Sequence, residues 1–417
     1  MIRLLQRDIY YGWVIVLALA CTETISWGVL YYTFAVLMPS MEAELGWSRV
    51  AMTGAFSLAL LLAGLAAPLF GRWLDRRGAR MLMTLGSCLA TALVFAWALV
   101  ADLFTFYLIW AGLGLAMAAV LYEPSFVVVT AWFDRQRVRA MSIVTFVAGF
   151  ASMIFIPLAS YLARAQGWRM ALVLLGVILG IGTIPLHAVL LRRWPQDLGL
   201  LPDGAGAAAP GDRLRATPAH SLDLQAALRA PAFWWLTSAF TLSALAAVAI
   251  TIHIIPYMLD RGYSAGFAAG AASLIGAMKF PGRLLFAPLE ARMARRWIAA
   301  LLALLQTLAL LLLVIVPSAA GALVFAALFG AANGAITLAR PALLAEYYGP
   351  AQYGSISGVL ALFLAGAQAL APIGAGALYT AFGSYEPVVW ILAALSLVSV
   401  AAVSQARVHG WMRYAVE

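Results

Sequence analysis

Twelve apolar runs of membrane-spanning length divide this chain of 417 residues, and they constrain its fold more than any other feature. A helix crosses the hydrocarbon layer of about 30 Å with about 20 residues. Because lipid offers the backbone no hydrogen-bond partners, spanning segments of this kind are expected to be helical. The predicted spans are residues 12–38, 50–70, 80–100, 104–131, 140–163, 168–191, 232–258, 266–288, 297–316, 319–346, 353–381 and 386–405.

The composition agrees with an integral membrane protein. Hydrophobic residues make up 65% of the chain and charged residues only 10%, whereas a soluble domain carries about 25% charged residues. The net charge of +9 comes from arginines scattered over loops, so a nucleic-acid-binding face is not expected. No nucleotide-binding loop, metal-ligand cluster or nucleophile–base pair is recognisable, so we expect no enzyme, cofactor or metal site.

The arginines predict the orientation of the chain. Nineteen lie in segments on the side that the two termini share, and only four (Arg49, Arg164, Arg169 and Arg261) lie on the opposite side. Loops that retain Lys and Arg are cytoplasmic. Both termini are therefore predicted to be cytoplasmic.

A polar stretch divides the spans six and six. We expect an N-terminal bundle (1–191), a cytoplasmic linker (192–231) and a C-terminal bundle (232–417). The linker is rich in Gly, Ala and Pro, which is typical of a flexible segment. Near its end, Ser221 is predicted to cap a short helix with Asp223 in its first turn. This helix is expected to lie on the membrane surface through an apolar stripe of Leu222, Leu224, Ala227 and Leu228.

An internal repeat supports two related halves. APLFGRWLDRR from Ala67 has a counterpart, APLEARMARR, from Ala287, at an offset of 220 residues. Halves of this kind are typical of alternating-access transporters, which bind substrate between them. The fold class is therefore predicted to be all-α, with twelve helices in two pseudo-symmetric six-helix bundles. The second copy has lost the acid, because Asp75 corresponds to Arg295.

Five charged residues lie inside the predicted spans. Two acids, Glu23 and Glu123, are in the first half, and three bases, Lys279, Arg283 and Arg340, are in the second. A charge at the bilayer centre costs at least about 2.5–3.5 kcal/mol, so each one is a candidate functional residue. Lys279 and Arg283 are four residues apart and share a helix face. For Glu123 and Arg340, a purely structural role in holding helices together is an equal alternative.

Other polar and aromatic residues complete the candidate site. Tyr31, Tyr122 and Asn333 are candidate ligand contacts, and they are equally able to bond a neighbouring helix. His253 is a candidate proton carrier, with helix packing as the more common role for such a histidine.

Residues 71–80, GRWLDRRGAR, join the second and third spans. This charged turn resembles the loop between helices 2 and 3 of the major facilitator superfamily. The resemblance implies a gate on the cytoplasmic side, in which the Asp75 carboxylate faces arginines and a helix N-terminus. The gating residues would be Gly71, Arg72, Asp75, Arg76, Gly78 and Arg80.

A closer resemblance points to one branch of that superfamily. RDIYYGW (7–13), AWFDRQRVRAMSIVTFVAG (131–149), PQDLGLLPDG (195–204) and FPGRLLF (280–286) are similar to segments of bacterial monocarboxylate porters and oxalate/formate antiporter-like proteins. The resemblance implies that Arg283 binds the substrate carboxylate. The animal carriers have an aspartate four residues before that arginine, where this chain has Lys279.

Together these patterns predict a secondary transporter that moves a small organic anion, with a monocarboxylate as the leading choice, by proton symport. Glu23 is the first choice for the proton-coupling carboxylate and Glu123 the second. The expected partners are the anion, protons and the lipid bilayer, without nucleic acid, and the expected state is a functional monomer in a bacterial cytoplasmic (inner or plasma) membrane. The alternatives are an organic-anion exchanger, proton-coupled efflux of cationic or amphiphilic molecules, and a receptor built on a transporter fold.

Overall fold

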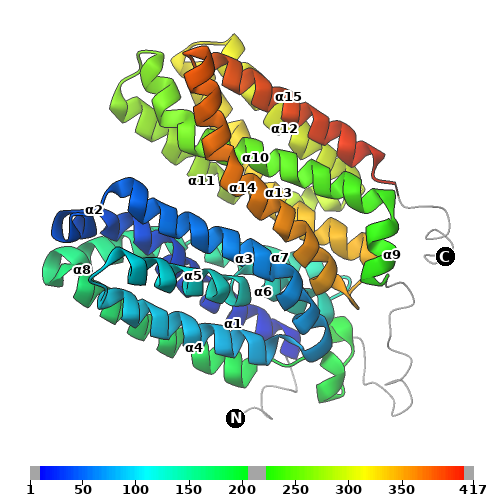
Figure 1. Ribbon diagram of the computed structural model, residues 1–417. Coiled ribbons are helices and arrows are strands. Elements are labelled where there is room, and N and C mark those ends of the chain that lie inside the picture. Colours follow the sequence, from blue (N-terminus) through cyan, green and yellow to red (C-terminus); the bar gives the residue numbers. More distant parts are fainter. Residues whose placement is uncertain (1–9, 205–221, 408–417) are drawn as a thin grey trace. The chain divides into compact units, whose positions relative to one another are not determined.

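The computed structural model describes residues 10–204 and 222–407, and within these ranges every regular element is a helix (Figure 1). Ten helical stretches of the described residues are long and apolar enough to cross a membrane. One of them, Arg137–Leu190, is interrupted at Gly167, where φ is 81°, and so covers two predicted spans. With α11 (Ala265–Glu290), each of the twelve predicted spans has a helical counterpart.

The chain forms two compact units. The first unit comprises Met1–Ser221 together with Gly349–Leu362, and the second comprises Leu222–Tyr348 together with Phe363–Glu417. The long helix α14 (Tyr353–Phe382) is therefore shared, because its first ten residues belong to the first unit. The division into bundles 1–191 and 232–417 stays a prediction.

The first unit is built from helices that turn back on one another. Its elements are α1 (Tyr11–Ser26), the π-helix η1 (Trp27–Tyr32), α2 (Thr33–Leu45), α3 (Arg49–Arg77), α4 (Ala79–Ala98), α5 (Leu103–Val120), α6 (Tyr122–Trp132), α7 (Arg137–Ala148), α8 (Ala151–Pro185), the π-helix η2 (Leu186–Leu190) and the 3₁₀ turns η3 (Pro195–Leu198) and η4 (Pro202–Gly204). Helix α3 packs against α5, α4 against α5 and α8, and α1 against α7 and α8.

Aromatic side chains fill the middle of the first unit. Trp97 and Trp110 are fully buried with ring centroids 4.9 Å apart, and the Phe34 ring meets Trp110 at the same distance. Such edge-to-face pairs add to the stability that burial alone provides. The turns between spans are short: Asp102, for example, caps α5 by accepting a hydrogen bond from the Thr105 amide at 2.8 Å.

The second unit has longer, more regular helices. Its elements are α9 (Leu224–Arg229), α10 (Pro231–Asp260), α11, α12 (Arg295–Ile315), α13 (Ala319–Tyr348), the rest of α14, and α15 (Glu386–Gln405). Buried Gln306 joins α12 to α10, because its amide accepts from the Ser243 hydroxyl at 2.7 Å and donates to the Ser243 carbonyl at 3.0 Å. A buried amide that hydrogen-bonds a neighbouring helix through both its oxygen and its nitrogen holds the two helices together.

The short helix before α10 is present, but its cap differs from the prediction. Asp223 is the N-cap, and its carboxylate accepts from the Ala226 amide at 2.7 Å. Ser221, the predicted cap, lies outside the described residues. Ala227 is fully buried, and the Trp234 indole donates to the Leu228 carbonyl at 2.8 Å. Helix α9 is thus packed against its own unit.

Candidate functional site

Glu23 lies in the interior of the first unit. Its side chain is 0% exposed, and its Oε1 accepts a hydrogen bond from the Ser125 hydroxyl of α6 at 2.6 Å. Among the described residues, Oε2 has no hydrogen-bond partner. A buried carboxylate with a single neutral donor is a poorly compensated charge.

The helices that carry Glu23 and Ser125 are both irregular close to these residues. Helix α1 changes into the π-helix η1 four residues after Glu23. Gly28 of η1 lies directly under the Phe155 ring, and a Cβ added to it would come within 2.2 Å of that ring. The fourth predicted span breaks at Leu121, which is extended (φ −87°, ψ −167°), and restarts as α6. Irregular turns of this kind occur frequently at functional sites.

Aromatic rings cover the same region of the first unit. The Trp27 ring contacts Tyr31 and Tyr122, with centroids 5.1 and 5.2 Å apart. All three rings are half-buried. Glu123 follows Tyr122 in the first turn of α6 and is also half-buried. The structure therefore brings Tyr31, Tyr122 and both acids to one part of this unit.

In the second unit, Lys279 and Arg283 lie on α11 where it crosses α13 closely. A Cβ on Gly334 would come within 2.2 Å of the Lys279 carbonyl oxygen, and one on Gly282 within 2.1 Å of the Ala331 carbonyl oxygen. Small residues allow such close approach between helices. Both cationic side chains are half-buried, and the Arg283 guanidinium lies 6.0 Å from the centre of the Phe280 ring.

Two further candidates, Asn333 and Arg340, lie on α13. The Asn333 amide donates to the Phe329 carbonyl at 2.8 Å and is half-buried. Arg340 lies two turns further on and is also half-buried. Glu346, near the end of the helix, pairs with Arg295 at 3.0 Å. The close crossing brings Gly334, the residue after Asn333, against the Lys279 backbone, whereas Arg340 lies further along α13.

His253 joins three elements of the second unit. Its Nε2 is 3.1 Å from the Pro372 carbonyl and its Nδ1 is 3.0 Å from the Tyr385 hydroxyl. A carbonyl only accepts, so Nε2 carries the hydrogen and Nδ1 of the neutral ring accepts from Tyr385. Both ring nitrogens are satisfied in this neutral form, which is the arrangement of a helix-packing histidine.

The Asp75 carboxylate caps the first turn of α14 inside the first unit. Its two oxygens accept from the Gly354 amide at 2.8 Å and from the Ser355 amide at 2.7 Å. Gly71 makes the approach possible, because a Cβ there would come within 1.9 Å of the Gly354 carbonyl oxygen. An anion at a helix N-terminus is stabilised by the helix dipole and by the free amides.

Among the described residues, the hydrogen bonds of Asp75 go to backbone amides of α14 and not to the arginines of its own turn. Arg72 and Arg76 are exposed, and Arg80 donates through Nε to the Ala188 carbonyl at 2.7 Å. Gly78 ends α3 with φ 75°, which only glycine adopts readily, and lies against the Arg193 side chain. At the repeated position in the second unit, Arg295 pairs with Glu290 and Glu346.

Replacing Asp75 with Asn is expected to raise the hydrogen-exchange rate of the Gly354 and Ser355 amides roughly tenfold. Charge-assisted hydrogen bonds are about twice as strong as neutral ones, and a single amide oxygen does not replace both carboxylate oxygens. Exchange measured by mass spectrometry on peptides covering 353–358 checks this. The exposed Arg72→Gln is the matched control. Equal exchange in Asp75→Asn and the unaltered protein would contradict the assignment.

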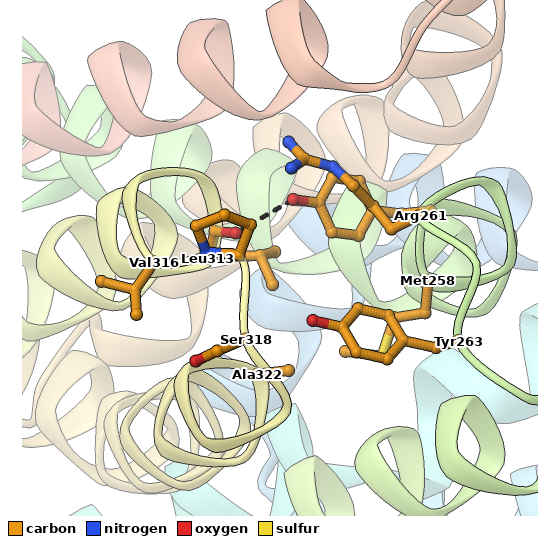
Figure 2. A pocket seen from close by; sticks show the side chains of 9 residues that line it. Met258, Arg261, Tyr263, Leu313, Val316, Ser318 and Ala322 are labelled. Carbon is orange, nitrogen blue, oxygen red and sulfur yellow. Dashed lines mark hydrogen bonds between the residues drawn. The ribbon is translucent and has the colours of Figure 1, made fainter.

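One pocket of the second unit is too small to hold an organic anion. It lies where α10 ends and α12 turns into α13, and Tyr257 donates there to the Leu313 carbonyl at 3.0 Å (Figure 2). Its volume of about 10 Å³ is room for about one water molecule. Arg261 lines it and pairs with Glu386 at 3.3 Å. None of the predicted site residues lines this pocket.

Sequence reasoning missed two buried polar pairs of the first unit. Ser125 was not selected, although it lies two residues after Glu123. The buried Ser87 hydroxyl and His187 Nδ1 are 2.8 Å apart and join α4 to η2. Their partners are about one hundred residues away in the chain, so no local pattern reveals them. A histidine inside an apolar run was the available signal for His187.

The helices and their intramembrane charges define a multi-pass membrane protein of the transporter class. A family model described as Major Facilitator Superfamily matches residues 17–293, which is more than half of the chain. The chain therefore belongs to the major facilitator superfamily. This confirms the predicted family and fold class, and also the prediction that the chain is not an enzyme, since members of this superfamily are transporters.

Similar proteins agree with this assignment. Monocarboxylate transporter 11 of Homo sapiens is 28% identical over 300 residues, covering 69% of this chain and 56% of the human protein. The oxalate:formate antiporter of Oxalobacter formigenes is 23% identical over 243 residues, covering 58% of this chain and 54% of that protein. The chain thus matches little more than half the length of these relatives. The crystal structure of the transporter FucP in the outward conformation has a TM-score of 0.72, with 16% identity, 95% of this chain and 99% of that chain covered, and this likeness shows the fold.

Proposed function

We propose that this chain transports a small organic anion, with a monocarboxylate as the first choice, together with a proton. The observation that carries the proposal is the pair Lys279 and Arg283, two cations one turn apart in a helix of membrane-spanning length. Charged residues inside membrane helices are costly and rare, and they mark substrate or ion pathways. The similarity to a protein named monocarboxylate transporter supports the same substrate class.

Each candidate residue receives a role in this proposal. Arg283 binds the substrate carboxylate through its planar pair of donors, and Lys279 supplies a second positive charge. Glu23 carries the proton. The remaining contacts with the substrate are assigned to Tyr31, Tyr122, Asn333 and Arg340, with Glu123 and His253 as second choices for the proton.

Coupling follows from the cost of charge in a low dielectric. An ionised Glu23 is stabilised by one hydroxyl, and an incoming anion brings a further negative charge into the membrane interior. Both effects favour the neutral, protonated carboxyl. The anion and the proton therefore bind together. The charge of the anion is balanced by the cation that binds it, and Glu23 is neutral.

The gate and the orientation are part of the proposal. The Asp75 contact with α14 is assigned to the closed form of the cytoplasmic side. The excess of arginines on the side of the termini supports an orientation with both termini in the cytoplasm. The protein is proposed to work as a monomer in the cytoplasmic membrane.

A second candidate function is exchange of two organic anions. It is favoured by the similarity to a protein named oxalate:formate antiporter. An exchanger needs no proton, so the two functions differ in their response to a pH gradient.

A ligand panel on the purified full-length protein tests the proposal. We expect mono- and dicarboxylates to raise the melting temperature and lipophilic cations to leave it unchanged. Uptake of the stabilising acid into proteoliposomes should then follow an imposed pH gradient, whereas an exchanger needs only anion inside. Stabilisation by cations alone would favour efflux of cationic or amphiphilic molecules, and ligand binding without any flux would favour a receptor.

A further inference from the structure

Ser125 and Glu23 form a hydrogen bond whose direction depends on the proton of the acid. Both side chains are 0% exposed, and their oxygens are 2.6 Å apart. An ionised carboxylate only accepts, so the serine hydroxyl has to donate to it. Oε2 has no hydrogen-bond partner among the described residues, so the proton of the neutral acid finds an acceptor only when it lies on Oε1, and the carboxyl then donates instead. The serine hydroxyl then accepts, and its single hydrogen has to turn elsewhere.

A second acceptor is available on the same helix. In a helix, a serine hydroxyl readily donates to the carbonyl four residues earlier. For Ser125 that residue is Leu121, at which the fourth span breaks. The serine therefore lies between the acid and the irregular turn, with one possible acceptor on each side.

Few other groups compete for this acid. Trp27 on its own helix and Ser125 and Glu123 from α6 face the Glu23 carboxyl. In the described part of the first unit, α7 and α8, which also pack against α1, bring no charged group to it. Of these groups, Ser125 is the one that hydrogen-bonds the Glu23 carboxyl, and Glu123 is the other acid.

We propose that Ser125 is a positioning residue that transmits the protonation state of Glu23 to the break between α5 and α6. With Glu23 ionised, the hydroxyl donates to Oε1. With Glu23 protonated, the hydroxyl accepts from Oε1 and donates to the Leu121 carbonyl, which changes the turn that carries Tyr122 and Glu123. This inference rests on the proposed role of Glu23 as the proton carrier.

A fluorine label beside the break tests the switch without any transport measurement. The Phe126 ring stacks on Tyr122 with centroids 5.4 Å apart, so fluorophenylalanine at position 126 reports on this turn and has no titrating group itself. We expect its ¹⁹F signal in the full-length protein to shift with pH. The shift should vanish in Glu23→Gln and in Ser125→Ala, and return in Ser125→Thr, which keeps the hydroxyl.

Thr130 supplies the matched control. It is a buried residue of the same helix, and its hydroxyl has no partner among the described residues. Thr130→Val is expected to keep the pH-dependent signal of the unaltered protein. A signal that follows pH equally in Ser125→Ala would overturn the proposal, as would a pH response that survives in Glu23→Gln.

Transport gives an independent readout. In Ser125→Ala the pH of half-maximal uptake is expected to rise by about one unit, because the lost donor favoured the ionised acid. Exchange between equal anion pools should keep its rate at low pH. If the fluorine signal behaves as expected but no proton-driven uptake exists, the proposed function fails while the hydrogen-bond switch stands. An unchanged pH profile with proton-driven uptake intact would instead refute the switch.

Discussion

Replacing Arg283 with Gln is expected to weaken carboxylate binding by roughly 10- to 100-fold and to abolish both uptake and exchange. Hydrogen bonds to a charged group contribute about 1.5–3 kcal/mol, and a factor of ten corresponds to about 1.4 kcal/mol. Glutamine keeps one donor group but neither the charge nor the paired geometry. Binding is measured by thermal shift or calorimetry, and flux with labelled substrate in proteoliposomes.

Other cations of the second unit make this test specific. Arg292 is exposed at the end of the α11 region, and Arg292→Gln is expected to bind and transport normally. Arg283→Lys keeps the charge and should recover binding only in part, because the planar fork is lost. Lys279→Gln should weaken binding with a smaller effect than Arg283→Gln. Normal affinity in Arg283→Gln would remove this arginine from the site.

Replacing Glu23 with Gln is expected to abolish accumulation driven by a pH gradient while sparing exchange between anion pools. Glutamine has the shape of the protonated acid, and its amide nitrogen donates to the Ser125 hydroxyl as the protonated carboxyl does, so the helices should pack as before. The site is then fixed in its neutral form and no longer carries a proton. Accumulation against the anion gradient, measured with and without an imposed pH difference, checks this.

Glu123→Gln is the matched comparison, because this second acid lies in the same region but is half-buried. We expect it to change the pH range of uptake without abolishing coupling. If Glu23→Gln and Glu123→Gln both accumulate substrate normally under a pH gradient, the proton-symport proposal is wrong. Anion exchange then becomes the better account.

The spans were predictable because the hydrophobic effect acts on long runs of sequence. An apolar run of about 20 residues has few structures open to it in lipid, so the helices and the family followed from the sequence. Helix ends were less predictable. Asp223 rather than Ser221 caps α9, since both residues suit the position and only the packing of α9 selects one.

The break in the fourth span has a signal in the sequence, which is Pro124. Pro124 lacks an amide hydrogen, and its ring clashes with the carbonyl of the residue four positions earlier, Val120. The helix stops at Val120 and restarts at Tyr122. The predicted span over 104–131 is present as the membrane-length stretch Leu103–Trp132, and the structure adds a break at Leu121 that the prediction did not include.

The irregularity of the first span had no comparable signal. The π-helix Trp27–Tyr32 contains no proline, and its Gly28 is explained only by the Phe155 ring of α8 that rests on it. The bond between Glu23 and Ser125 joins residues 102 positions apart. Contacts of this kind depend on how helices pack, so the sequence identified the acid but not its partner.

The Asp75 contact lies at the start of the long helix α14. Its first ten residues belong to one compact unit and the rest to the other, so the boundary between the units falls inside a helix rather than in a loop. The two hydrogen bonds of Asp75 hold the first turn of this helix, and Pro372 lies in the part of the helix that belongs to the second unit. Each hydrogen bond to a charged group contributes about 1.5–3 kcal/mol, so we expect the two bonds at Asp75 to keep this first turn attached to the first unit in almost all molecules.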